Sequence, residues 1–380
     1  MFLVRILVLL LVVTVPSFCQ IVKTEVLFIL YDLGETQAVK PLMNILQKNG
    51  TGYKILAFGK SSEAFPSDPN CIPLPIPEPE ILKWDRTKKL PESVLSLLGA
   101  IQCKVAIAGM ASCVQAQAVN LFKSKGAYTI AVYDNFDSPS TKDFISAFIG
   151  YEPKVHELWV PSKPVYDGFS KDFKPFWSQM YIMGQPALES WQHVFATTDR
   201  ASIREELDIN PETTCVLFVG GYDDTYEEAL KVFLESTHLF QDKDVQFIIS
   251  PHPKTSGELE KKLVDELPND CNILIPTGYS TSELATIANL VVCHKSTVGI
   301  LALYQGVPVV YVAKKSDYSN FAIQEGNAMQ VENAPDLVDV ISDLLNPSKG
   351  SKKSFESLGI PTNASKVMSE RIMQRLEKAA

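Results

Sequence analysis

The stretch "VVCHKSTVGILALYQGVPVVYV", residues 291–312, decides the fold. Together with the preceding "NL", its first residues form a continuous β-branched run, which is typical of a strand covered on both faces. The segment "GILALYQG" has the length of a helix and closes with glycine, and "VPVVYV" is apolar and β-branched again. The stretch therefore predicts strand, turn, helix and strand, with Ser296 and Thr297 at the start of the helix.

Ser296 and Thr297 admit two interpretations. The free backbone N–H groups and the dipole of a helix N-terminus favour a phosphate or another anion there. Hydroxyl side chains also cap many helices that bind nothing. The motif alone leaves both interpretations open.

The same alternation of strand and helix runs through the rest of the chain. In the N-terminal half the pattern predicts strands at 24–32, 53–59, 104–109, 128–134 and 156–162, with helices at 35–50 and 114–126. In the C-terminal half it predicts strands at 215–221, 245–250, 271–276 and 289–293, with helices at 226–238, 256–267 and 281–289. Such alternation makes parallel sheets with helices on both faces, which bind ligands at the carboxyl ends of their strands. The expected fold class is α/β, with two Rossmann-like, doubly wound parallel-sheet domains.

A chain of 380 residues suits two domains of about 150 to 200 residues. We expect an N-terminal domain at 20–185, a linker at 186–210, a C-terminal domain at 211–345, and a tail at 346–380. In the tail, Met368, Ile372 and Leu376 share one face of a helix, which is expected to cross back onto the first domain. The net charge of −9 without an extended basic run argues against a nucleic-acid partner. The oligomeric state cannot be inferred.

The first residues have the pattern of a secretory signal peptide. They carry one Arg, an apolar run from Ile6 to Val15, then Pro16 and small residues before Cys19. We expect cleavage near residue 19 and a location in the secretory pathway, extracellular or periplasmic, with a signal anchor as the alternative. Two sequons, Asn49-Gly-Thr and Asn363-Ala-Ser, could then be glycosylated in a eukaryotic host.

Six cysteines follow the expected signal peptide, and an oxidising compartment would permit disulfides between them. Several adjoin apolar strands, where buried free thiols are equally expected. None has metal-ligand spacing, so no metal site is predicted.

Polar residues at the carboxyl ends of the predicted strands are the candidate site. Gly220 and Gly221 end a buried strand and would let the backbone approach a ligand, although such glycines are often only turns. His252 lies between Pro251 and Pro253 directly after "FIIS", so its imidazole could donate a hydrogen bond to a phosphate or leaving group. With Ser296 and Thr297, His252 would form a pocket for an anion.

Carboxylates follow two strands of the N-terminal half. "YDLGET" offers Asp32 and Glu35, and "YDNFDS" offers Asp134 and Asp137. Each could instead be a helix cap or a turn former. Asp134 directly ends a buried strand and is the preferred general base, with Glu35 as the second choice.

The order "YIMGQPALESW", "REELDI", "VLFVGG", "SPHP" and "STVGILALYQGVPVVYV" resembles the C-terminal half of GT-B fold glycosyltransferases. It is also similar to the lipid A disaccharide synthase and UDP-N-acetylglucosamine 2-epimerase families, and His252 resembles the histidine of the "HP" element in bacterial sialyltransferases. The resemblance implies two domains facing a cleft, a nucleotide sugar held by the C-terminal domain, a glycan or small-molecule acceptor on the N-terminal domain, and no metal or other cofactor.

One departure bears on the donor. Many members of these families have a glutamate in the helix after the small-residue turn, where it holds the nucleotide ribose, and the matching pair here is Leu301-Ala302. This difference argues against a UDP-sugar, and the combination of the "HP" and "ST" elements favours a cytidine-linked or otherwise atypical donor, or a degenerate site. The sequence therefore predicts a metal-independent glycosyltransferase. A sugar-nucleotide epimerase or hydrolase and a secreted two-lobed solute-binding protein remain as alternatives.

Overall fold

The structure is a computed structural model that describes residues 21–74, 90–136, 155–172, 179–239, 245–267, 272–344 and 359–378. The expected signal peptide, Asp137 and Cys271 lie outside the described residues. None of the helices within these ranges has the length and hydropathy that a bilayer crossing requires.

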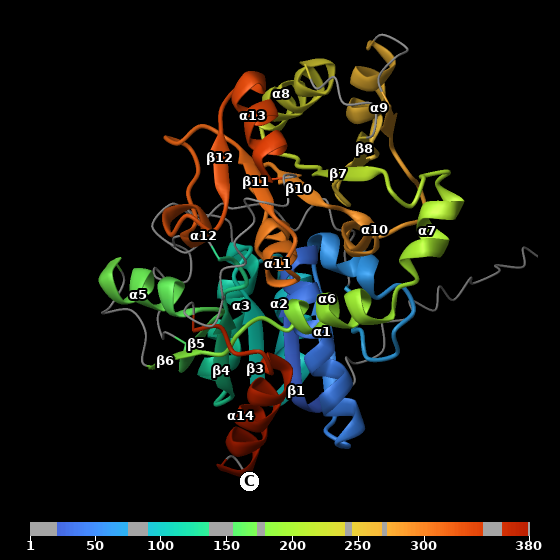
Figure 1. Cartoon of the computed structure of the whole chain (residues 1–380). Coiled ribbons are helices and arrows are strands. Elements are labelled where there is room, and N and C mark those ends of the chain that lie inside the picture. The colour runs from blue at the N-terminus through green and yellow to red at the C-terminus, as the bar shows by residue number, and fades with distance from the viewer. Residues whose placement is uncertain are drawn as a thin grey trace, which may run out of the picture.

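The N-terminal lobe is built on a six-stranded parallel sheet (Figure 1). Its strand order is β2-β1-β3-β4-β5-β6. The bounds are β1 Val22–Leu30, β2 Tyr53–Ala57, β3 Ile101–Gly109, β4 Tyr128–Val132, β5 Glu157–Val160 and β6 Gln179–Ile182. The strands are apolar on both sides because helices cover both faces. The sequence pattern predicted no strand at β6, which lies within residues 20–185, expected for the N-terminal domain.

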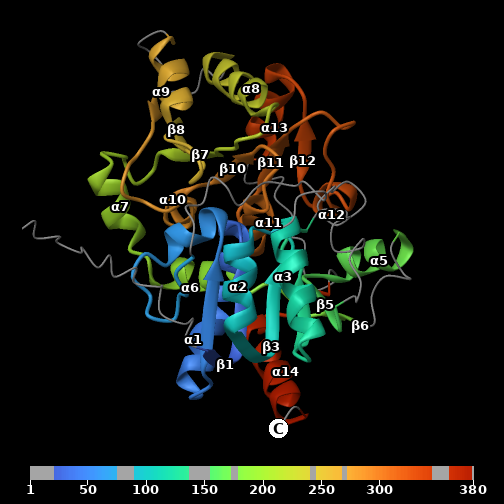
Figure 2. The same cartoon turned by 180° about the vertical axis from the view of Figure 1, so that it is seen from behind.

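Helices cover the two faces of this sheet with separate apolar clusters. Helix α1 (Leu33–Lys48) and the C-terminal α14 (Ala364–Lys378) pack on one face. Helices α2 (Glu92–Ala100), α3 (Cys113–Ser124) and α5 (Lys163–Asp172) pack on the other, as Figure 2 shows for α2 and α3. The short 3-10 helix η1 (Gly59–Ala64) follows β2.

The C-terminal lobe repeats this architecture with a second six-stranded parallel sheet. Its strand order is β12-β11-β10-β7-β8-β9, with bounds β7 Thr214–Val219, β8 Val245–Ser250, β9 Ile273–Leu274, β10 Leu290–Cys293, β11 Val309–Val312 and β12 Met329–Val331. Its helices are α8 Tyr226–Leu239, α9 Glu258–Asp265, α10 Thr281–Ile287, α11 Val298–Tyr304, α12 Phe321–Gln324 and α13 Ala334–Leu344. Residues 291–312 form strand, turn, helix and strand, as predicted.

The chain returns to the N-terminal lobe at its end. Met368, Ile372 and Leu376 of α14 are buried in the same cluster as α1 and β1, which confirms the expected crossing helix (Figure 1). Residues 186–210, expected as a linker, contain α6 (Ala187–Thr197) and α7 (Arg200–Glu206). The predicted class, two doubly wound parallel-sheet lobes with a returning helix, is confirmed.

Candidate functional site

The carboxyl ends of the two sheets meet where the lobes face each other. Each sheet has a point where the strand order reverses, between β1 and β3 in the N-terminal lobe and between β7 and β10 in the C-terminal lobe. Ligands of open α/β sheets bind in the crevice at such points. Lys254, after β8, places its Nζ 2.5 Å from Oδ2 of Asp32, which follows β1. The loops at these strand ends therefore define a site shared by both lobes, called the cleft below.

Glu35 is fully buried in the first turn of α1. Its Oε1 accepts hydrogen bonds from Gln115 Nε2 at 2.6 Å, from the Asp32 backbone N–H at 3.1 Å, and from the Tyr31 backbone N–H. Burial raises the pKa of Glu35 to about 8, and the charge of Asp134 adds to the shift, while the two backbone N–H groups oppose it. The carboxyl is therefore protonated at neutral pH and has no surface open to a ligand.

Asp134 is half-buried directly beyond β4. A Cβ on Gly34 would lie 3.0 Å from Asp134 Oδ2, so this carboxylate rests against the first turn of α1. The Asp134 backbone carbonyl accepts a hydrogen bond from Gln185 Nε2, which ties the loop to the segment before α6. Asp134, Asp32 and Glu35 are thus gathered on the N-terminal side of the cleft.

His252 lies on the C-terminal side. Its Nδ1 accepts a hydrogen bond from the Lys254 backbone N–H at 3.0 Å, and its ring packs on Tyr222 with centroids 4.5 Å apart. Burial and, to a smaller degree, the Lys254 ammonium lower the pKa of His252 to about 4, against the opposing charge of Asp32. At neutral pH the imidazole is therefore uncharged with its proton on Nε2, where it can donate to a ligand.

The two candidate glycines are required by packing within the protein. A Cβ on Gly220 would lie 2.5 Å from the His252 backbone nitrogen, and a Cβ on Gly221 would lie 2.8 Å from the Tyr226 ring. Gly220 therefore lets the loop after β7 pack against the loop that carries His252. A direct contact of either glycine with a ligand stays a prediction.

A second polar cluster joins the loops after β7 and β10. His294 Nδ1 lies 2.8 Å from the Val312 carbonyl oxygen, and its Nε2 lies 3.0 Å from Thr225 Oγ1 and 3.1 Å from Asp223 Oδ1. Lys295 Nζ donates to Thr225 Oγ1 at 2.8 Å. A small hollow of about 30 Å³ lies beside these side chains. Nothing in the local sequence pattern connects Asp223 to His294, so only the tertiary structure shows this cluster.

Ser296 and Thr297 are half-buried in the turn before α11. Ser296 Oγ accepts a hydrogen bond from the Val298 backbone N–H at 3.2 Å, whereas the Thr297 side chain makes no capping bond. Ser296 thus has a capping role whether or not it binds an anion. Leu301, which stands where the resembling families have glutamate, is buried in the apolar cluster of this lobe.

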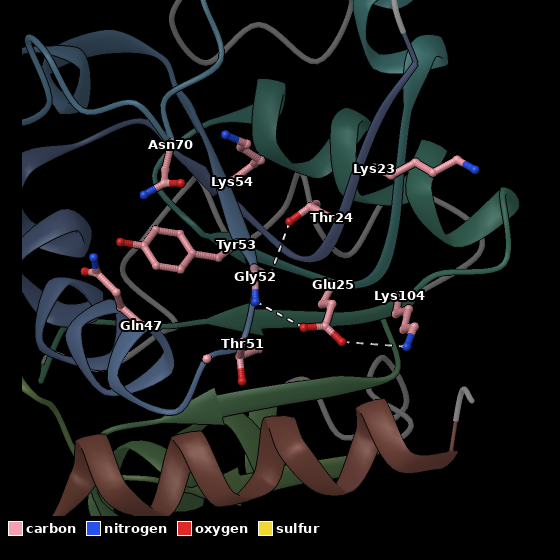
Figure 3. Close-up of a pocket in the computed structure, with 11 residues that line it drawn as sticks. Lys23, Thr24, Glu25, Gln47, Thr51, Gly52, Tyr53, Lys54, Asn70 and Lys104 are labelled. Atoms are coloured by element: carbon pink, nitrogen blue, oxygen red, sulfur yellow. Dashed lines mark hydrogen bonds and ion pairs between the residues drawn. The ribbon is translucent and has the colours of Figure 1, made fainter.

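A hollow of about 650 Å³ lies at the edge of the N-terminal sheet opposite the cleft, and Figure 3 shows the residues that line it. It is an open surface depression beside the amino end of β1 and the loop before β2. Its charged side chains are largely satisfied by the protein, since Glu25 accepts from the Gly52 backbone N–H and pairs with Lys104. None of Asp32, Asp134, His252 and Lys254 lines this hollow, so the candidate site is the cleft.

The described cysteines, Cys71, Cys103, Cys113, Cys215 and Cys293, are all free. Burial raises the pKa of Cys103 to about 12 and also raises that of Cys293, so neither thiol is activated. Within the described residues, no group of three or more His, Cys, Asp or Glu side chains is arranged to hold a metal ion.

No protein-family model and no curated protein matches this sequence. Solved structures do match in fold. UDP-GlcNAc 2-epimerase from Neisseria meningitidis bound to UDP-GlcNAc aligns with a TM-score of 0.66 and 14% identity over 92% of this chain and 100% of its own. UDP-GlcNAc 2-epimerase from Methanocaldococcus jannaschii, in complex with UDP-GlcNAc and UDP, aligns with a TM-score of 0.63 and 16% identity over 93% of this chain and 99% of its own. The wall teichoic acid polymerase TagF aligns with a TM-score of 0.60 and 12% identity over 93% of this chain and 89% of its own.

These similarities extend over nearly the whole of each chain, so the arrangement of the two lobes is shared as well as the lobes themselves. The protein has the GT-B fold of the UDP-GlcNAc 2-epimerases and of a teichoic acid polymerase, as the sequence resemblance implied.

Proposed function

We propose that the chain is an inverting, metal-independent glycosyltransferase, which moves a sugar from a nucleotide-activated donor to a glycan or small-molecule acceptor. The observation that carries this proposal is that a candidate base and candidate phosphate-binding groups lie on opposite sides of the cleft. Half-buried Asp134 stands on one side, and an uncharged His252 beside the Lys254 ammonium stands on the other. Structures of the same fold are described with UDP-GlcNAc bound or as a polymerase, which supports a nucleotide-linked substrate.

The proposed reaction assigns one task to each side of the cleft. The Asp134 carboxylate accepts the proton of the acceptor hydroxyl as its oxygen bonds to the anomeric carbon of the donor sugar. The bond from that carbon to the phosphate oxygen breaks, and its electron pair leaves with the nucleotide. The N–H of His252 Nε2 and the ammonium of Lys254 would stabilise the charge that develops on the departing phosphate.

Glu35 fits this reaction less well as the base. It is fully buried, and its Oε1 already accepts hydrogen bonds from three donors. A carboxyl with a pKa of about 8 is protonated at neutral pH and cannot accept a further proton. Within the proposal, Glu35 positions Asp32 and α1, and Asp134 touches the acceptor.

A sugar-nucleotide epimerase or hydrolase is the second candidate. The observation that favours it is the full-length fold similarity to several UDP-GlcNAc 2-epimerases. Against it, buried Leu301 stands where the resembling families have the glutamate that holds the ribose. The chain therefore lacks that means of recognising a uridine nucleotide. Turnover of a donor in the absence of any acceptor would favour this candidate over the transferase.

A thermal-shift screen tests the proposal directly. Wild type, His252→Ala and the control His193→Ala, which changes an exposed histidine on α6, are each melted with CMP, CDP, UMP, UDP and their sugar conjugates. A nucleotide at 100 times its Kd should stabilise the native state by about 2.7 kcal/mol. We expect cytidine nucleotides to raise the Tm of wild type and of His193→Ala at least as much as uridine nucleotides, with a smaller rise for His252→Ala.

Three outcomes would contradict the proposal in different ways. Strong dependence on uridine alone would remove the argument from Leu301. A Tm increase with free small solutes and none with nucleotides would favour the secreted two-lobed binding protein. Equal nucleotide effects on wild type and His252→Ala would place the nucleotide away from His252.

A further inference from the structure

Lys254 is the one described side chain that forms an ion pair between the two lobes at the cleft. Its Nζ lies 2.5 Å from Asp32 Oδ2 and donates to Tyr222 Oη at 3.2 Å. The same ammonium lies 4.2 Å from the centroid of the Tyr222 ring. Only 18% of the Lys254 side chain and 27% of the Asp32 side chain are exposed, so water screens this pair only in part.

Lys295, a second lysine at the carboxyl edge of this sheet, is held differently. It bonds Thr225 and lies 3.7 Å from Asp223, and both partners belong to its own lobe. Its position is therefore independent of how the lobes meet. The acidic partner of Lys254, in contrast, comes from the other lobe.

The side chains that share the cleft with Lys254 include two carboxylates and an uncharged imidazole. Asp32 and Asp134 contribute carboxylates on the N-terminal side, and His252 is uncharged at neutral pH. The Asp32 charge also raises the pKa of Lys254 against the opposing effect of burial, so the amine stays charged. An anion in this part of the cleft would be repelled by the two carboxylates unless Lys254 turned from Asp32 toward it.

We propose that Asp32 is an internal stand-in for the phosphate group of the ligand, and that ligand binding transfers Lys254 from Asp32 to that phosphate. The exchange replaces one ion pair by another and leaves the Asp32 carboxylate free to accept a hydrogen bond from the acceptor. Donor binding thereby prepares the acceptor side, which makes binding ordered. This inference rests on the proposed function only for the identity of the acceptor.

Tyr222 and His252 support this exchange geometrically. The Tyr222 ring contacts both the Lys254 ammonium and the His252 ring, and the Lys254 backbone N–H holds His252 Nδ1. Among the residues that the structure describes, His252 Nε2 makes no hydrogen bond. A phosphate that accepts a hydrogen bond from the N–H of His252 Nε2 would therefore lie beside Lys254, which turns toward it in the proposed exchange.

The test is calorimetric titration of inorganic pyrophosphate at fixed ionic strength into the full chain and its variants. Lys254→Ala should weaken binding about tenfold or more, because a hydrogen bond to a charged group contributes about 1.5 to 3 kcal/mol. Asp32→Asn should tighten binding about three- to fivefold, because the competing carboxylate is gone. Asp32→Asn should improve binding less in the Lys254→Ala background than in wild type, because without Lys254 it removes only the repulsion between the carboxylate and the anion.

Asp32→Asn is expected to fold, because asparagine caps helices as well as aspartate does and keeps the oxygen that accepts from the Leu33 N–H. Lys231→Ala and Glu227→Gln are matched controls, since they break an exposed pair on α8 of the same lobe. Both should bind pyrophosphate as wild type does.

The outcomes separate this inference from the proposed function. Unchanged or weaker binding by Asp32→Asn, or unchanged binding by Lys254→Ala, overturns the exchange even if nucleotides bind and sugar is transferred. The predicted changes in binding by a protein that never transfers sugar would support the exchange and refute the transferase. Absence of binding to wild type of both pyrophosphate and every nucleotide overturns both.

Discussion

Gly109 and Glu35 are in such close contact that a Cβ on Gly109 would lie 1.8 Å from Glu35 Oε2. The glycine ends β3, and the glutamate belongs to the first turn of α1, which follows β1, so the contact lies where the strand order of the N-terminal sheet reverses. Glu35 Oε2 has no hydrogen-bond partner among the described residues. A buried carboxyl in this position links the stability of the lobe to pH.

Glu35→Gln should remove a loss of stability that wild type suffers between pH 5 and 8. The pKa of Glu35 is about 8 in the folded protein against an ordinary value of 4.5, so in this range only the unfolded state ionises. The contribution of Glu35 to stability is therefore greatest below pH 4.5 and is lost as the pH rises toward 8, by up to about 1.4 kcal/mol per pH unit. Glutamine keeps an oxygen for the three donors and does not ionise.

Urea unfolding at pH 5, 6, 7 and 8 measures this difference. The free energy of unfolding of Glu35→Gln minus that of wild type should grow steadily with pH. Glu63→Gln, which changes an exposed side chain on η1, should give a constant difference. Parallel curves for Glu35→Gln and wild type would show that Glu35 is ionised in the folded protein.

Asp134→Asn and His252→Ala should affect the proposed transfer differently. Loss of the base should slow turnover by roughly a hundredfold or more while nucleotide binding persists. His252→Ala should weaken nucleotide binding as well, by about 1 to 3 kcal/mol, because a hydrogen bond to phosphate is lost. Turnover and nucleotide Kd are measured for each variant with the donor found by the thermal-shift screen.

The contrast between the two variants is decisive. Equal loss of nucleotide binding in both would place Asp134 in the nucleotide pocket or in the fold. Full activity of Asp134→Asn would return the search for the base to Glu35.

Glu157→Gln should destabilise the protein by about 3 to 5 kcal/mol, because it leaves two arginines without their partner. Glu157 is fully buried at the start of β5 and accepts hydrogen bonds from Arg371 at 2.9 Å and Arg375 at 2.8 Å, both on α14. Tyr128 and Trp159 also donate to it, at 2.7 and 2.8 Å. This cluster fastens α14 to the N-terminal lobe.

Urea unfolding at neutral pH measures the loss. Glu370→Gln, which removes an exposed partner of Lys366 on the same helix, should change stability by no more than about 0.5 kcal/mol. Similar effects of the two substitutions would mean that α14 is held mainly by its apolar face.

Expression in a eukaryotic secretory host should yield a protein cleaved near residue 19 and carrying N-linked glycans. Both sequon asparagines, Asn49 and Asn363, are exposed, so each can accept a glycan without disturbing the core. Mass spectrometry of the secreted protein, before and after enzymatic deglycosylation, measures both events. Asn49→Gln and Asn363→Gln should each remove one glycan. An uncleaved, unglycosylated and cell-retained product would contradict the signal-peptide prediction.

The sequence by itself determined the alternation of strands and helices. Strands buried on both faces must be continuously apolar, and the helices between them show a helical period of apolar residues, so both patterns are visible in short stretches of sequence. The stretch 291–312 showed this directly, and the helix face of Met368, Ile372 and Leu376 predicted the returning α14. Short or weakly apolar elements could not be predicted in this way. Strand β6 has partly exposed residues, and the local pattern did not predict it.

The site depended on tertiary structure to a greater degree. Position after a strand suggested Asp134, Glu35 and His252, since parallel strands bring their carboxyl ends to one edge. Local sequence could not show that Glu35 is sealed against Gly109, that His252 is uncharged, or that Asp32 and Lys254, 222 residues apart, form a pair. Burial and charge at a site are sums over neighbours from distant parts of the chain, so only the packed lobes decided which of the candidate side chains a ligand could reach.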